Sequence, residues 1–324
     1  MAVANACNLF SLKPNVAGTI IEQDEIVARA VHFREAQHID IDLTTRNAAI
    51  PISVVAAVSA AISVCRRGRL PPQFGLVKAI LTVVAVALSI AAARGENLNP
   101  LILEQVRKMP SGGKYSTSHY AKIKLQSSAH FESGKLFPLP KKPFPSFCSG
   151  ATYLVFIRTI EELRARGQLK LDFATLDQLV VRNQRDGEGV WGRWNSNGPG
   201  TARLFHELGL GPNFDDFAQA RPGDFMKIFW NKNVGRRESG HSVIFLGTEN
   251  RAGVEYVRYW SSNIPSGYGE KSVPRSKITY AIFSRLEAPG NLSQVHSVPL
   301  VDSYLASLLR KKSNFAEATK KCGI

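Results

Sequence analysis

Four segments rich in β-branched and aromatic residues follow one another closely, and they constrain the fold more than any other feature. Only short, turn-rich segments separate them, and strands joined in this way pair antiparallel. Helical periodicity lies upstream of them, and helices followed by strands predict an α+β fold with an antiparallel sheet. The four segments are DFMKIFW (224–230), HSVIFLG (241–247), VEYVRYWS (254–261) and ITYAIFSRL (278–286).

A helix that begins with a cysteine is predicted upstream of these strands. From Cys148 to Arg166 apolar residues recur at helical spacing, and Gly167 is expected to end the helix. Amides at a helix N-terminus stabilise a thiolate, which is the nucleophilic form of cysteine. Cys148 is therefore a candidate nucleophile. The alternatives are a small packing residue and a disulfide with Cys322.

A cysteine nucleophile needs a base within hydrogen-bonding distance and a polar group that orients the base. His241 opens one predicted strand, and Asn263 follows the end of the next. A hairpin of these two strands brings the residues side by side, and Asn263 can then accept the ring N–H of His241 and fix its tautomer. The order Cys148, His241, Asn263 predicts a catalytic triad for acyl transfer.

These residues lie in motifs that resemble those of the NlpC-type cell-wall peptidases and the related CHAP amidases. Both are papain-like cysteine hydrolases of peptidoglycan peptides. The matching motifs are CSG (148–150), PGD (222–224) and the histidine strand (241–247), and CHAP members place a polar residue where Asn263 stands. The resemblance implies a papain-like core, with the nucleophile-bearing helix packed on the sheet. The tyrosine-glycine segment of NlpC members is not recognisable, so the backbone amide of Cys148 is the expected oxyanion donor.

Four further residues are predicted to contact the substrate. Trp191 and Trp194 stand in a turn-rich polar segment, where aromatic side chains line a groove or, alternatively, clamp the core. Arg237 can form bidentate pairs with substrate carboxylates, although a solvated loop is the alternative. Ser262 precedes Asn263 and is expected to shape the site.

Composition restricts the partners. The chain has 41 Lys and Arg against 26 Asp and Glu, a net charge of +15 that favours anionic partners. The basic residues are scattered and form no nucleic-acid-binding motif, so no nucleic acid is expected. The four cysteines lack metal-binding spacing, and a cysteine triad needs no metal or cofactor. We expect a monomer that acts on peptidoglycan, an anionic polymer, or on another peptide.

Two apolar stretches precede this region, at 49–65 and 79–93. The second follows Lys78 and ends in three alanines, which is typical of a signal peptide. Residues 77–93 are therefore expected to be a signal peptide or a membrane anchor. Residues 1–76 are either an extension created by a mis-assigned start, with Val77 as the true start, or they carry the first helix of a transmembrane hairpin. Two apolar core helices are the remaining alternative.

The predicted organisation after the apolar segments has three parts. Residues 94–147 form a helical and proline-rich lead-in, 148–290 the hydrolase domain, and 291–324 a basic tail. The chain is thus expected to be an exported cysteine peptidase or amidase of the periplasm or cell envelope. The alternative is a catalytically inactive papain-like module that binds cell-wall peptides or an envelope partner.

Overall fold

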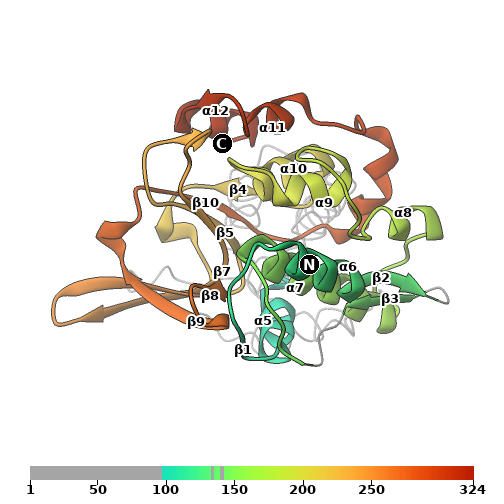
Figure 1. Ribbon diagram of the computed structural model, residues 1–324, viewed down its shortest axis with the longest axis horizontal. Helices are drawn as coiled ribbons and strands as arrows, with labels where there is room; N and C mark the ends of the chain where they lie inside the picture. The colour runs from blue at the N-terminus through green and yellow to red at the C-terminus, as the bar shows by residue number, and fades with distance from the viewer. Residues whose placement is uncertain (1–96, 133–134, 139–141) are drawn as a thin grey trace, which may run out of the picture. The chain divides into compact units, whose positions relative to one another are not determined.

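The computed structural model describes residues 97–132, 135–138 and 142–324 (Figure 1). The expected signal segment at 77–93 and the extension at 1–76 lie outside these ranges. Within them, no helix is long and apolar enough to cross a membrane.

The central feature is a seven-stranded antiparallel sheet with the strand order β1-β9-β8-β7-β5-β10-β4. Helices accompany it, so the α+β class and the antiparallel sheet are confirmed. The strands of the sheet are β1 (Gly112–Gly113), β4 (Asn213–Phe214), β5 (Phe225–Phe229), β7 (Gly240–Arg251), β8 (Val254–Asn263), β9 (Gly267–Pro274) and β10 (Tyr280–Ser284).

All four predicted strands are present, but their connection differs from a simple meander. A further strand, β9, follows β8. It was not predicted, because its sequence GYGEKSVP lacks the β-branched and aromatic pattern that marks a strand. The last predicted strand, β10, then pairs with β5 on the other side of the sheet. The tip of the long β7–β8 hairpin extends away from the helices, while its open end lies among them (Figure 1).

Most helices come before strand β4 in the chain, and two come after β10. They are α5 (Asn99–Arg107), α6 (His119–Ser128), α7 (Cys148–Ala165), α8 (Phe173–Asp177), α9 (Gly189–Asn195), α10 (Gly200–Leu208), α11 (Ser303–Ser307) and α12 (Phe315–Lys321). Two small ribbons pair β2 (Ala129–Glu132) with β3 (Lys135–Pro138) and β6 (Val234–Gly235) with β11 (Lys312–Ser313). Short 3-10 helices occupy Phe217–Gln219, Arg275–Lys277 and Pro289–Ser297.

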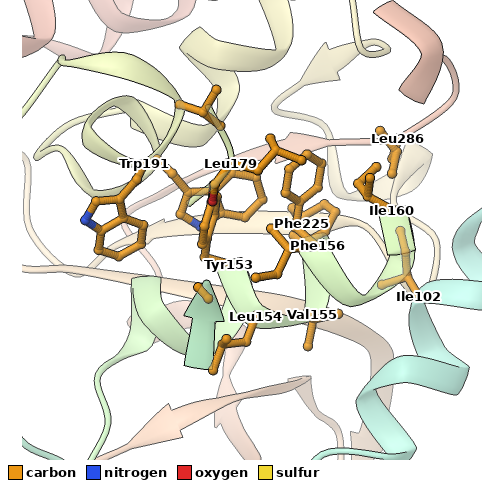
Figure 2. Close-up of a cluster of buried hydrophobic side chains, with 14 of the residues drawn as sticks. Ile102, Tyr153, Leu154, Val155, Phe156, Ile160, Leu179, Trp191, Phe225 and Leu286 are labelled. Carbon is orange, nitrogen blue, oxygen red and sulfur yellow. The ribbon is translucent and has the colours of Figure 1, made fainter. Parts of the chain in front are cut away.

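Helix α7 forms the centre of the main hydrophobic core, and it begins at Cys148 as predicted. It packs against β7 and β8, and also against α5 and α9. Tyr153 and Ile160 lie on one side of the helix, whereas Leu154 and Val155 point to the other (Figure 2). All four side chains are fully buried, so the helix is enclosed rather than half exposed. Such a support holds its first residue rigidly.

The described residues from 97 onwards form one compact unit, and both the predicted lead-in and the predicted tail pack onto it. In the predicted lead-in, Ile102 of α5 belongs to the core around α7, and β1 extends the sheet. In the predicted tail, Ala318 and Cys322 pack on Phe229 of β5. Apolar side chains of both the proline-rich lead-in and the basic tail are buried in the structure.

The predicted PGD turn leads into β5 through a buried ion pair. The Asp224 carboxylate is fully buried and accepts hydrogen bonds from Arg285 Nε at 2.9 Å and Nη2 at 2.7 Å, and from Asn99 Nδ2 at 2.8 Å. Gly223 has φ +100°, and a Cβ there would lie 2.8 Å from the backbone oxygen of Asn99. The turn therefore joins α5 to β5 and the end of β10, and it fixes where β5 begins.

Candidate active site

Cys148 is the first residue of α7 and is partly exposed. The preceding residue, Phe147, is extended, and no side chain caps the helix start. Cys148 opens into a cleft of ≈ 620 Å³ whose lining includes Trp191 of α9, Lys227 of β5 and Ser242 of β7. The start of the helix thus brings a thiol and free backbone amides to the surface of a cleft.

His241 and Asn263 meet at the open end of the β7–β8 hairpin, as the hairpin reasoning predicted. His241 Nε2 lies 3.1 Å from Asn263 Oδ1. The Asn263 amide nitrogen donates to the carbonyl oxygens of Gly269 at 2.8 Å and Ser261 at 3.3 Å, which orients Oδ1 towards the imidazole. A ring that donates from Nε2 keeps Nδ1 as an acceptor, so Asn263 selects the tautomer that a base requires.

The thiol of Cys148 is strongly acidified by its surroundings. Burial is the largest single influence and opposes ionisation, but the groups around the thiol together outweigh it, foremost the hydrogen bond and the charge of His241, and the pKa falls from 9.0 to about 6. The backbone N–H of Ser242 and the ammonium group of Lys227 also lower the pKa of Cys148. At neutral pH the side chain is therefore mainly a thiolate, the form that attacks a carbonyl carbon.

Tyr115 also reaches the thiol, which the sequence reasoning did not predict. Burial raises the pKa of the Tyr115 hydroxyl, and so do the charge and the hydrogen bond of Cys148. The phenol therefore keeps its proton and acts as a donor. The backbone brings it there, because Tyr115 N donates to Pro265 O at 3.0 Å and Ser146 N donates to Lys114 O at 3.1 Å.

The sequence carries one signal for Tyr115, the glycine pair that precedes it. A Cβ on Gly113 would lie 2.5 Å from the backbone oxygen of Phe144. Gly113 thus marks a close approach of two backbone segments rather than a simple break in the chain.

Ser262 does not line the cleft, where it was predicted to shape the substrate site. It is fully buried, accepts a hydrogen bond from Ser146 Oγ at 2.8 Å, and donates to Ser146 O at 3.0 Å. These hydrogen bonds join the end of the strand that carries Asn263 to the segment that leads into Cys148. Ser262 therefore holds two parts of the site together.

The two tryptophans lie on helix α9, not in the predicted loop, and they differ in position. Trp191 lines the cleft, and its ring packs on Phe147 and Tyr153. Trp194 is 1 % exposed, and its Nε1 donates to Thr152 Oγ1 at 3.2 Å. Trp194 is thus part of the aromatic core, the alternative interpretation of its sequence.

Arg237 is exposed in the turn before β7, with φ +68°, and it is not among the residues that line the cleft.

Cys148 and Cys322 are both free thiols. Burial raises the pKa of Cys322 to about 12, so this thiol stays protonated and unreactive at neutral pH, in contrast to Cys148. In the described ranges, no group of three or more His, Cys, Asp or Glu side chains could hold a metal ion.

Comparison of the chain with protein-family models, curated proteins and solved structures finds no match. The geometry around Cys148 is therefore the basis for a functional assignment.

Proposed function

We propose that the protein is an exported cysteine peptidase or amidase with a papain-like core, of the NlpC and CHAP type, that cleaves amide bonds in peptidoglycan peptides. One observation carries the proposal. A partly exposed, acidified Cys148 stands at a helix start beside His241, and Asn263 orients that histidine. Nucleophile, base and orienting group in this order are the requirements for covalent catalysis by cysteine.

The reaction would proceed by acyl transfer. The Cys148 thiolate attacks the amide carbonyl carbon while His241 holds the proton as an imidazolium. The oxyanion that forms accepts hydrogen bonds from the backbone N–H of Cys148 and the hydroxyl of Tyr115. His241 then gives its proton to the leaving amine, and a thioester remains on Cys148.

Water completes the cycle. His241 takes a proton from a water molecule, the resulting hydroxide attacks the thioester, and the second tetrahedral intermediate releases the carboxylic acid and the thiolate. Asn263 keeps the ring in one orientation throughout. The net result is the hydrolysis of one amide bond, without any metal or cofactor.

Peptidoglycan is the proposed substrate for two reasons. Its peptides carry carboxylates, which suit a chain of net charge +15. The apolar segment at 77–93, which has the features of a signal peptide, would bring the protein to the cell envelope, where this polymer lies.

The test is digestion of purified peptidoglycan by the full-length protein, with mass spectrometry of the released peptides. We expect a new amine terminus and a new carboxyl terminus at one type of bond, absent with Cys148→Ala and retained with Cys322→Ala as the matched cysteine control. Equal products from wild type and Cys148→Ala would overturn the proposal. Binding without cleavage by a protein with an inert Cys148 would support the inactive module instead.

A further inference from the structure

Lys227 lines the cleft into which Cys148 opens. It lies on β5 directly opposite Ser242 of β7. Cys148, Lys227 and Ser242 line the same cleft, and the backbone N–H of Ser242 and the charge of Lys227 both lower the pKa of the thiol. Strand pairing therefore sets an ammonium group next to the point where a scissile amide would be attacked.

The position of this ammonium group is fixed by a nearly buried partner. Lys227 Nζ lies 2.6 Å from Glu238 Oε1, and the Glu238 side chain is 3 % exposed. The other carboxylate oxygen accepts from Gly198 N at 2.6 Å and Gly235 N at 2.9 Å. Glu238 thus cannot turn away, and it holds the lysine in one place.

The lysine still has hydrogen-bonding capacity that faces the cleft. An ammonium group has three donors, and Glu238 Oε1 accounts for one of them. Gly240 keeps the space around it open, because a Cβ there would lie 2.9 Å from Lys227 Nζ. Asp186 and Lys122 are among the other charged residues that line the cleft.

The buried pair has no clear value for stability alone. Removing two charges from water has a desolvation penalty that often equals or exceeds their attraction, so an apolar pair would stabilise the fold as well. A cation with free donors beside a nucleophile, in contrast, suits the binding of a carboxylate through charge-assisted hydrogen bonds.

We propose that Lys227 is a specificity-determining residue that binds a carboxylate of the substrate beside the scissile amide. The substrates would then be acidic peptides, cleaved in preference to the same peptides with that carboxylate amidated. This inference rests on the proposed function, but the anion site itself can be tested without any hydrolysis.

The first test compares two alkylating agents on the Cys148 of the full-length protein. Iodoacetate carries a carboxylate, whereas iodoacetamide is neutral. The same thiolate attacks both agents and displaces iodide, so the ratio of the two rates is independent of the pKa of Cys148. We expect Lys227→Met to lower the iodoacetate-to-iodoacetamide ratio by roughly tenfold or more, the usual effect of losing a hydrogen bond to a charged group.

Two controls make this result specific. Lys232→Met removes the same charge from an exposed lysine that does not line the cleft, and it should leave the ratio unchanged. The double variant Lys227→Met/Glu238→Gln avoids an unpaired buried carboxylate, so a folding defect cannot explain the loss. An unchanged ratio in both Lys227 variants would overturn the proposal and leave Lys227 as a structural partner of Glu238.

The second test uses a pair of peptides that differ only in a free or amidated carboxylate next to the cleaved bond. We expect wild type to prefer the acidic peptide in kcat/KM by roughly tenfold or more, and Lys227→Met to lose that preference. Cleavage of both peptides with equal efficiency would contradict the specificity while the hydrolase function stands. Failure to cleave either peptide, with the alkylation ratio still dependent on Lys227, would reject the hydrolase function and retain the anion site.

Discussion

His241→Ala should make the thiol of Cys148 much less acidic. The imidazole is the largest influence that lowers the pKa of Cys148, through a hydrogen bond and through its charge. Burial, which raises the pKa, remains in the variant. The weaker contributions of the Ser242 N–H and Lys227 remain as well. We therefore expect the pKa of the thiol to rise well above its wild-type value of about 6 in the variant.

The magnitude follows from the two pKa values. A change from 9.0 to about 6 corresponds to about 4 kcal/mol of preferential stabilisation of the thiolate, at about 1.4 kcal/mol per pKa unit. At pH 7 a thiol with a pKa of about 6 is roughly nine-tenths ionised, whereas one with the ordinary pKa of 9.0 is about one-hundredth ionised. Thiolates of higher pKa are intrinsically better nucleophiles, so the rate at one pH changes by less than this fraction. The midpoint of the pH profile is thus the quantity to measure.

The assay is the rate of iodoacetamide labelling of the Cys148 peptide in the full-length protein, followed by mass spectrometry between pH 5 and pH 10. Because the pKa is lowered, wild-type labelling should rise as the pH passes about 6. Cys322, with its pKa raised to about 12, should stay unlabelled while the protein is folded. His119→Ala is the matched control, because His119 lines the same cleft and does not act on the thiol.

Two results would refute this reasoning. One is a wild-type midpoint near 9, which would mean that the groups around the thiol give the thiolate no net stabilisation. The other is a midpoint near 6 that persists in folded His241→Ala, which would assign the acidification to the helix start or to Lys227.

Three further changes test the supports of the site. Arg285→Met leaves the buried Asp224 carboxylate without its counter-charge, and it should lower the free energy of unfolding by about 3–5 kcal/mol in urea titration. Asp224→Asn in the same chain should restore part of that loss. Trp194→Ala empties a core position and should lower the unfolding free energy by about 3–5 kcal/mol, whereas a surface tryptophan would give almost no change. Asn263→Ala should lower kcat by about tenfold or more and leave the labelling midpoint of Cys148 near its wild-type value, since Asn263 orients the base and does not touch the thiol.

Local patterns in the sequence predicted where Cys148, His241 and Asn263 lie. The helix start at Cys148 follows from helical periodicity, and the meeting of His241 with Asn263 follows from the two strands of one hairpin. These relations span short distances along the chain, so spacing alone is informative.

Residues that reach the site through distant pairing were not predictable in this way. Tyr115 arrives because β1 pairs with β9, and Lys227 arrives because its strand is in register with Ser242. The register of strands separated in sequence depends on the whole sheet. The polar neighbours of Trp194 left a groove and a clamp over the core as alternatives, and its ring is buried in the core, where apolar area determines the position.

The most direct measurement is the amide-hydrolysing activity that remains as Cys148 is progressively alkylated. With a peptidoglycan peptide as substrate, activity should fall in proportion to the fraction of Cys148 modified and reach zero when modification is complete. Activity that persists after complete modification of Cys148 would contradict the assignment of this thiol as the nucleophile.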